Sequence, residues 1–353
     1  MKTSQNQSSL KRICGIWLMA WFFMNRIFLS FLFLIVAALS VNSLQAQTPV
    51  YKYKFTVAKD GSGDYRYIQD AIDAMRVFPL ARITLYIKNG VYNEKIELPA
   101  TNTDVSFIGE SVDSTIVVFN DYSGRGRLTT FTSWTAKISG NRFTAENITF
   151  SNSAGPVGQA VALHVDADSA VFRNCRFLGN QDTIYAGGET SCQYFENCYI
   201  EGTTDFIFGP AAVFFRRCTI RCKANSFVTA ASTRKDRKFG FVFLDCVIKA
   251  DSSVTKLYLG RPWRANAKTV FLRCVLPAAI TPEGWNNWNN KENERTAFYA
   301  EYGNYGAGAG LSRRASWSHR LRESEAAEYT RETEKWSAGI SGGERSDSVI
   351  CWL

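Results

Sequence analysis

The stretch from Val171 to Gly209 contains one pattern twice, first as VFRNCRFLGNQDT and, 23 residues later, as YFENCYIEGTTDF. When Cys175 is aligned with Cys198, Asp182 falls opposite Asp205, because each aspartate follows its cysteine by seven residues. Two acidic side chains therefore occupy one position on successive copies of a repeat.

The repeat extends in both directions along the chain. Apolar and polar residues alternate around each cysteine, which is typical of a short strand with one buried face. A spacing of 20 to 28 residues between copies indicates a solenoid with one coil per repeat. We therefore predict an all-β fold, a right-handed parallel β-helix, in which equivalent residues on adjacent coils stack about 4.8 Å apart. The further copies are centred on Ile148, Cys218, Cys246 and Cys274.

Both ends of the solenoid need covering, because unpaired strand edges invite aggregation. Apolar residues within Ile68–Met75 follow helical spacing and predict an N-terminal capping helix. The first coil strands are expected at Ile83–Ile87 and Val105–Ile108. Beyond the repeats, a glycine-rich loop at 302–310 and a charged, helix-like segment at Leu321–Trp336 predict a C-terminal extension, with the helix packed outside the last coils.

Residues 1–46 have the layout of a signal peptide, since the apolar run Ile27–Ser40 follows a basic residue and precedes small polar residues. We predict that this segment is cleaved, that Met24 is an alternative start, and that 47–353 form a single domain. Export to the periplasm or the cell exterior follows, with no stable membrane span in the mature form. An uncleaved membrane anchor is the alternative, because residues 13–23 are also apolar.

The chain carries a formal net charge of +9, and residues 1–46 contribute four basic residues and no acidic ones. The remainder, near +5, suits an anionic polymer as substrate and equally suits an ordinary soluble surface. The sequence contains no basic low-complexity tract and no nucleic-acid-binding motif, so we predict no nucleic-acid partner.

Nine cysteines in an exported chain would ordinarily indicate disulfides. Five of them occupy the equivalent position of the repeat, and we interpret these as an inward-facing stack of small apolar thiols. Cys14 leaves with the targeting segment, so one bridge remains open among Cys192, Cys222 and Cys351. No spacing of cysteine and histidine matches a zinc site.

Catalytic chemistry must come from few residue types. The chain has only two histidines, His164 and His319, and no Gly-x-Ser-x-Gly elbow, which disfavours a Ser–His–Asp hydrolase. His164 follows an apolar run and is interpreted as structural. Asp182 and Asp205, if stacked, repel each other, so one holds a proton at neutral pH while the other ionises. Such a pair supplies a general acid and a nucleophile. The alternative is that both are ordinary turn residues.

Five segments of the chain occur in the order found in the pectinesterase (pectin methylesterase) family, which the sequence resembles over roughly residues 52–336. Each motif alone is weak, whereas five in order are highly specific. Ile184 departs from the leucine that is usual in the family. The segments are GVYNE at 90–94, QAVAL at 159–163, QDTIY at 181–185, DFIFG at 205–209 and LGRPW at 259–263.

The resemblance implies hydrolysis of galacturonate methyl esters in pectin, with release of methanol. It implies that Asp205 is the nucleophile and that Asp182 is the general acid/base, which protonates departing methanol and then activates water. Gln159 and Gln181 match the oxyanion-hole donors of the family, a task for which side-chain amides offer N–H groups.

Two further residues match substrate-binding positions of the family. Arg261 matches the residue that orients the nucleophile and keeps it ionised, a task suited to a rigid guanidinium fork. Trp263 matches a wall on which a sugar ring stacks, or alternatively packs into the core. The resemblance implies methyl-esterified homogalacturonan as the partner. We predict no cofactor and no metal, because Gln159 and Gln181 can hold the oxyanion and the sequence shows no acid cluster of calcium-binding type, and we expect a monomer.

Other activities remain open on this fold. A polygalacturonase would also use paired acids, and a pectate lyase would need a calcium-binding cluster of acids and a basic residue. A polysaccharide-binding solenoid would not need both aspartates, both glutamines and Arg261 together. The glutamines beside the two aspartates favour ester hydrolysis.

Overall fold

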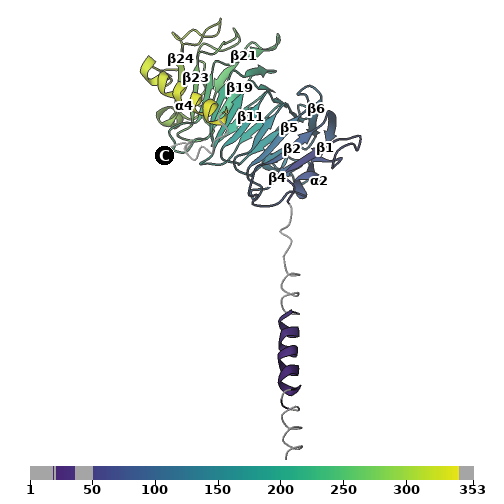
Figure 1. The fold of residues 1–353 in the computed structure, drawn as a ribbon. Helices are drawn as coiled ribbons and strands as arrows, with labels where there is room; N and C mark the ends of the chain where they lie inside the picture. Colours follow the sequence, from purple (N-terminus) through teal and green to yellow (C-terminus); the bar gives the residue numbers. More distant parts are fainter. Residues whose placement is uncertain (1–18, 20, 36–50, 342–353) are drawn as a thin grey trace, which may run out of the picture. The chain divides into compact units, whose positions relative to one another are not determined.

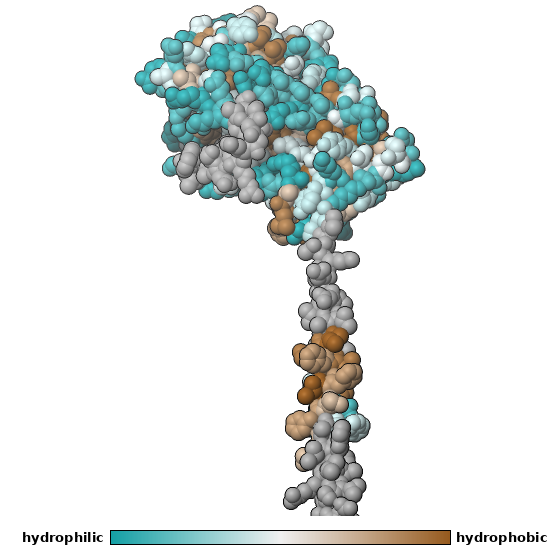
Figure 2. All heavy atoms as spheres, in the orientation of Figure 1, coloured by the Kyte–Doolittle hydropathy of each residue, from teal (hydrophilic) through white to brown (hydrophobic). Residues whose placement is uncertain are grey.

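The computed structural model describes residues 19, 21–35 and 51–341, with the last five as backbone only (Figure 1). The chain divides into two units, residues 1–51 and 52–353. In the first unit, residues 21–35 are helical and expose mostly apolar side chains (Figure 2). Across the described residues, no helix combines the length and apolar character that a membrane crossing requires. The end of the targeting segment, at residue 46, lies outside the described residues, so its cleavage stays a prediction.

The second unit coils through three parallel sheets in turn, and each strand pairs with the equivalent strand one coil away (Figure 1). This arrangement confirms the predicted parallel β-helix. A single coil cannot bury its own apolar face, so stacking of neighbours creates the core. The first sheet contains, in order, β1 (Lys54–Val57), β2 (Ile83–Ile87), β5 (Val105–Gly109), β8 (Thr144–Glu146), β11 (Ala170–Arg173), β14 (Cys192–Glu196), β17 (Ala212–Arg216), β20 (Phe241–Leu244), β23 (Lys268–Leu272), β24 (Phe298–Tyr302) and β25 (His319–Arg320).

The second and third sheets have seven strands each. The second contains β3 (Gly90–Asn93), β6 (Thr115–Phe119), β9 (Thr149–Asn152), β12 (Arg176–Leu178), β15 (Tyr199–Gly202), β18 (Thr219–Cys222) and β21 (Val247–Ala250). The third contains β4 (Ile96–Leu98), β7 (Ala136–Ile138), β10 (Leu163–Val165), β13 (Ile184–Ala186), β16 (Ile207–Gly209), β19 (Phe227–Ala231) and β22 (Tyr258–Gly260).

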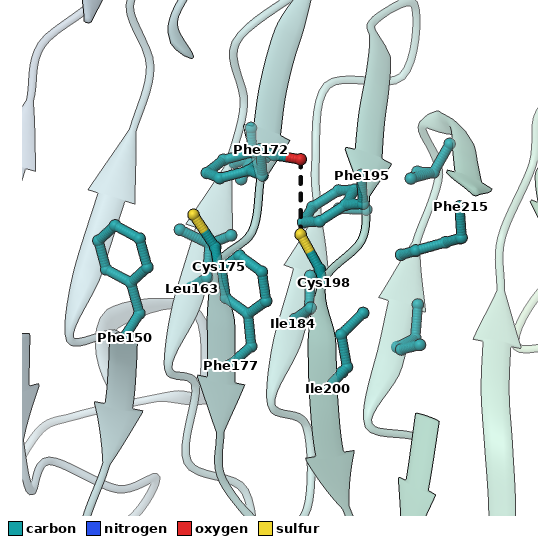
Figure 3. Packing of buried hydrophobic residues seen from close by; sticks show 14 of the residues in the cluster. Phe150, Leu163, Phe172, Cys175, Phe177, Ile184, Phe195, Cys198, Ile200 and Phe215 are labelled. Atoms are coloured by element: carbon teal, nitrogen blue, oxygen red, sulfur yellow. Dashed lines mark hydrogen bonds between the residues drawn. The ribbon is translucent and has the colours of Figure 1, made fainter. Parts of the chain in front are cut away.

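A sharp bend joins the first sheet to the second in successive coils. The residue before each aligned cysteine has a positive φ, 50° at Asn174 and 53° at Asn197, a conformation that asparagine tolerates. The cysteine after the bend then points inward: Cys198 is buried, and its Sγ donates to the carbonyl oxygen of Phe172 at 3.4 Å (Figure 3). The same bend recurs at Asn147, Arg217, Asp245 and Arg273.

Phenylalanine rings stack along the interior beside the cysteines. The ring of Phe195 stacks on Phe172 with centroids 4.6 Å apart and on Phe215 with centroids 5.0 Å apart (Figure 3). Truncating one such ring to alanine typically costs about 3–5 kcal/mol of stability. The predicted stack of inward thiols is confirmed, because all five aligned cysteines are free and buried: Cys175, Cys198, Cys218, Cys246 and Cys274.

The remaining cysteines separate into two kinds. Cys222 is a buried free thiol at the end of β18. Cys192, at the start of β14, is disulfide-bonded. Cys222 is therefore not its partner, and Cys351 lies outside the described residues.

The N-terminal end of the solenoid is covered by α2 (Ile68–Asp73), which confirms the predicted capping helix. The helix buries Ile68 and two further apolar residues in the main core. Both carboxylate oxygens of Glu94 accept backbone N–H groups at the start of α2, from Ile68 at 3.1 Å and Gln69 at 3.0 Å. Glu94 therefore satisfies N–H groups that the first turn of a helix leaves unpaired.

The C-terminal extension contains α4 (Glu323–Ser341), which confirms the predicted helix. It packs on the outer face of the first sheet, where Trp336 stacks on Tyr194 of β14 and Phe214 of β17 at centroid distances of 6.3 and 6.5 Å. The helix thus reaches the middle coils as well as the last ones. A short helix that the sequence analysis did not predict, α3 (Lys291–Thr296), precedes β24.

Candidate active site

Asp182 and Asp205 occupy one position on adjacent coils of the third sheet. Each precedes its strand by two residues, and the strands pair in register with Ile184 opposite Ile207. Both aspartates have left-handed backbone conformations, with φ of 65° and 49°. The two residues are only 4% and 6% exposed. The structure therefore brings together the two acids that the repeat aligns.

Arg261 lies directly after β22 and binds Asp205 through two hydrogen bonds. Its Nη2 donates to Oδ2 at 2.6 Å and its Nε donates to Oδ1 at 3.0 Å. The guanidinium lies between the rings of Phe227 and Trp288, with Cζ 4.0 Å and 3.6 Å from their centroids. Aromatic faces attract cations, so the two rings hold the arginine in the orientation that binds Asp205.

The two carboxyls differ in their electrostatic surroundings. Burial and the nearby charge of Asp205 raise the pKa of Asp182 to about 8, against the opposing effects of Gln159 and Arg261. Burial also raises the pKa of Asp205, while the hydrogen bonds and charge of Arg261 act in the opposite direction. Asp182 therefore carries a proton at neutral pH, and Arg261 favours the ionised form of Asp205.

Gln159 and Gln181 lie on adjacent coils next to the aspartates. They pair as an isolated parallel bridge, and the backbone N–H of Ala160 donates to the carbonyl oxygen of Gln181 at 3.1 Å. The side chain of Gln159 acts on the carboxyl of Asp182 and lowers its pKa, while its Oε1 accepts a hydrogen bond from Thr130 Oγ1 at 2.7 Å. The structure thus places both glutamines on the coils that carry the carboxyl pair.

Aromatic side chains line the outer face of the third sheet beside this pair. Trp263 stacks on Phe131 with centroids 6.4 Å apart and meets Phe208 edge-on at 5.8 Å. Phe131 also meets Tyr185 edge-on at 5.1 Å and is 44% exposed. Of this group, only Trp263 was predicted from the sequence as a site residue. Tyr185 and Phe208 each follow one of the aligned aspartates by three residues, a signal that could have found them.

His164 lies on β10 and is buried. Its Nε2 is 3.0 Å from Oδ2 of Asp166, and its ring meets Tyr185 edge-on at 4.7 Å. This packing agrees with the structural interpretation of the histidine. Within the described residues, no group of three or more histidine, cysteine, aspartate and glutamate side chains is arranged to hold a metal ion.

The fold and site together define a parallel β-helix with a paired-carboxyl centre on one outer face. A family model described as Pectinesterase matches residues 54–335. Pectinesterase 31 of Arabidopsis thaliana is 38% identical over 284 residues, covering 77% of this chain and 89% of that protein. The chain belongs to the pectinesterase family. A probable pectinesterase/pectinesterase inhibitor of the same plant is 41% identical, but its match covers only 49% of its length.

Solved structures agree with this assignment. Pectin methylesterase from carrot is 35% identical, with a TM-score of 0.77 over 84% of this chain and 96% of that one. The deglycosylated pectin methylesterase of Aspergillus niger is 31% identical, with a TM-score of 0.72 over 82% and 96% of the two chains. A pectin methylesterase in complex with a hexasaccharide is 27% identical, with a TM-score of 0.68 over 79% and 95%.

Proposed function

We propose that this chain is a pectin methylesterase, which hydrolyses galacturonate methyl esters in pectin and releases methanol. The observation that carries the proposal is the asymmetry of the carboxyl pair. Arg261 binds both oxygens of Asp205, whereas Asp182 forms no ion pair with any described residue and has a pKa of about 8. One acid is thus suited to attack and the other to donate a proton.

In the first half of the reaction, an oxygen of the Asp205 carboxylate attacks the carbonyl carbon of the ester. The carbonyl π bond opens to a tetrahedral oxyanion, which then collapses and breaks the bond to the methoxy oxygen. Asp182 gives its proton to that oxygen, so methanol leaves instead of methoxide. The product is an anhydride between Asp205 and the galacturonyl group.

In the second half, the Asp182 carboxylate accepts a proton from water as the water oxygen attacks the galacturonyl carbon. The anhydride bond breaks, Asp205 regains its carboxylate, and Asp182 is again protonated. Gln159 and Gln181 donate N–H groups to the oxyanion of both halves, where such donors act more strongly than in bulk water. No metal or cofactor takes part in this scheme.

The polymer would lie across the aromatic surface beside the acids. Trp263 offers a flat apolar face to a sugar ring, and Arg261 maintains the ionisation of Asp205. An excess of basic residues favours association with an anionic polysaccharide. We propose that the mature protein works as a secreted or periplasmic monomer on methyl-esterified homogalacturonan.

The test is methanol release from highly methylated pectin by the purified protein of residues 47–353, with chain cleavage followed by viscosity and new reducing ends. We expect methanol release without depolymerisation. Depolymerisation without methanol would favour a polygalacturonase or a lyase, and pectin binding without either product would favour a binding solenoid. Treatment with EDTA should leave the initial rate unchanged, whereas a loss restored by calcium would contradict the metal-free scheme.

A further inference from the structure

Gln159 carries an amide with two ends of opposite character, and only one of them suits the proposed reaction. Its Nε2 donates hydrogen bonds, as an oxyanion and the Asp182 carboxylate require, whereas its Oε1 only accepts them. The residue is exposed, so burial does not fix the rotation of the amide. Something else must determine which end faces the carboxyl pair.

Thr130 supplies that contact. Its Oγ1 donates to Oε1 of Gln159 at 2.7 Å. With Oε1 engaged by the hydroxyl, the amide N–H groups remain for Asp182, and the Gln159 side chain lowers the pKa of that carboxyl, as an N–H donor would. The accepting end of the amide is therefore occupied by a donor, which leaves the N–H end for the carboxyl pair.

Thr130 itself is held firmly. It is 8% exposed and begins a 3₁₀ turn (Thr130–Thr132) whose first turn is closed by a capping box between Thr129 and Thr132. Ser133 adds a hydrogen bond from its Oγ to the carbonyl oxygen of Thr130 at 2.8 Å. A donor on a fixed turn restrains its acceptor more than a mobile one would, because less conformational freedom is lost when the bond forms.

The backbone of Gln159 is restrained from the same segment. The N–H of Ser123 donates to the carbonyl oxygen of Gln159 at 2.9 Å, and Ser133 Oγ accepts the N–H of Val161 at 3.2 Å. The loop and turn between β6 and β7 thus hold both the main chain and the amide of Gln159.

We infer that Thr130 is a positioning residue that orients the Gln159 amide toward the carboxyl pair, an inference that rests on the esterase function proposed above. The threonine does not act on the substrate in this role. Its hydroxyl acts only through Gln159, so its contribution must vanish when Gln159 is removed.

The experiment compares Thr130→Val, Thr130→Ser, Gln159→Ala and the double variant Thr130→Val/Gln159→Ala in methanol release. Valine keeps the shape of threonine without the hydroxyl. Removing one oxyanion donor typically lowers kcat by about 10²–10³-fold. We expect Thr130→Val to lower kcat by about tenfold or more relative to wild type, with little change in KM. Thr130→Ser should restore the rate. In the Gln159→Ala background, Thr130→Val should change kcat by less than about twofold, because the two effects are not independent.

A second readout separates orientation from general damage. Gln159 lowers the pKa of Asp182. If Thr130→Val turns the amide away, that pKa should rise, so the alkaline limb of the kcat profile should move to higher pH in Thr130→Val and not in Thr130→Ser. Circular dichroism verifies folding, and Thr130→Ala serves as a second hydroxyl-free variant.

Three results would overturn the inference. The first is a folded Thr130→Val enzyme with wild-type kcat. The second is a double variant whose fold-loss in kcat equals the product of the losses in the two single variants. The third is failure of both hydroxyl-free variants to fold, which would assign Thr130 to the fold alone. A wild-type protein that releases no methanol would instead overturn the proposed function, and the inference with it.

Discussion

Arg261 holds both carboxylate oxygens of Asp205 from a position 56 residues further along the chain, across the intervening coil of β19. Asp182, one coil before Asp205, receives no such pair of bonds from any described residue, and its raised pKa of about 8 keeps it protonated at neutral pH. A single arginine thereby makes two stacked, chemically identical side chains unequal. The following predictions depend on that inequality.

Replacing Arg261 with lysine should lower kcat by about tenfold or more, because an ammonium group cannot form two parallel bonds to one carboxylate. The pKa of Asp205 should rise, since the hydrogen bonds of Arg261 lower it. The acid limb of the kcat/KM profile should therefore move to higher pH. Arg273→Lys is the matched control, because Arg273 also forms two bonds with an aspartate, Asp245, at 2.8 and 3.0 Å on the outside of the coil. Equal losses in the two variants would contradict a special role for Arg261.

Asp205→Asn and Asp182→Asn should both abolish turnover, for different reasons. Without the Asp205 carboxylate no acyl-enzyme can form, whereas without the Asp182 proton the poor leaving group methoxide cannot depart. Both variants should remain folded and bind pectin, because an amide has nearly the volume of the acid. Methanol release, with binding followed by calorimetry, checks this. Asp245→Asn should keep wild-type activity. Near-full methanol release by folded Asp205→Asn would end the carboxylate-nucleophile mechanism for this protein.

Asp182 should also make stability depend on pH. Its folded-state pKa of about 8 exceeds the value near 3.9 of an unfolded aspartate, so the folded protein binds the extra proton between those values. The stabilisation is complete below about pH 4 and is lost as the pH rises through 8. Asp182→Asn lacks this loss, so its Tm relative to wild type should increase from pH 5 to pH 9. An unchanged Tm difference between variant and wild type across that range would show that the folded state does not destabilise the ionised form of Asp182.

Trp263→Ala should raise KM by a few-fold to about tenfold with a smaller change in kcat, as expected for an aromatic contact of about 0.5–1.5 kcal/mol. The ring lies in the aromatic surface with Phe131 and Phe208 and is not hydrogen-bonded to either of the two proposed catalytic acids. Initial rates over a range of pectin concentrations measure the effect. Trp263→Phe, which keeps a flat ring, should recover most of the affinity. A kcat defect at unchanged KM would remove the tryptophan from substrate binding.

The solenoid and the acid pair were predictable because repetition encodes both. Cys175 and Cys198 mark one position per coil, and any residue at a constant offset from them, such as Asp182 or Asp205, must stack with its counterpart. The capping helix was predictable for another reason, since its apolar spacing is local and needs no knowledge of the rest of the chain.

The supporting contacts of the site were not predictable in this way. Thr130 and Phe131 come from the connection between β6 and β7, and Trp288 lies beyond the last coil of the third sheet. These segments share no repeat position with the aspartates, and their folding depends on contacts across coils. A residue in such a connection, such as Trp288 against Arg261, therefore has no repeat position in the sequence from which its contact could be predicted.

The solenoid architecture determines the order in which the enzyme loses activity and structure as it unfolds. Each coil bonds only to its two neighbours, so melting can begin at one end and advance step by step. Asp205 keeps its arginine only while the coils of β19 and β22 stay docked. Unfolding from the C-terminal side would therefore inactivate the enzyme while most strands remain paired. Activity would then be lost before a loss of β-structure could be detected.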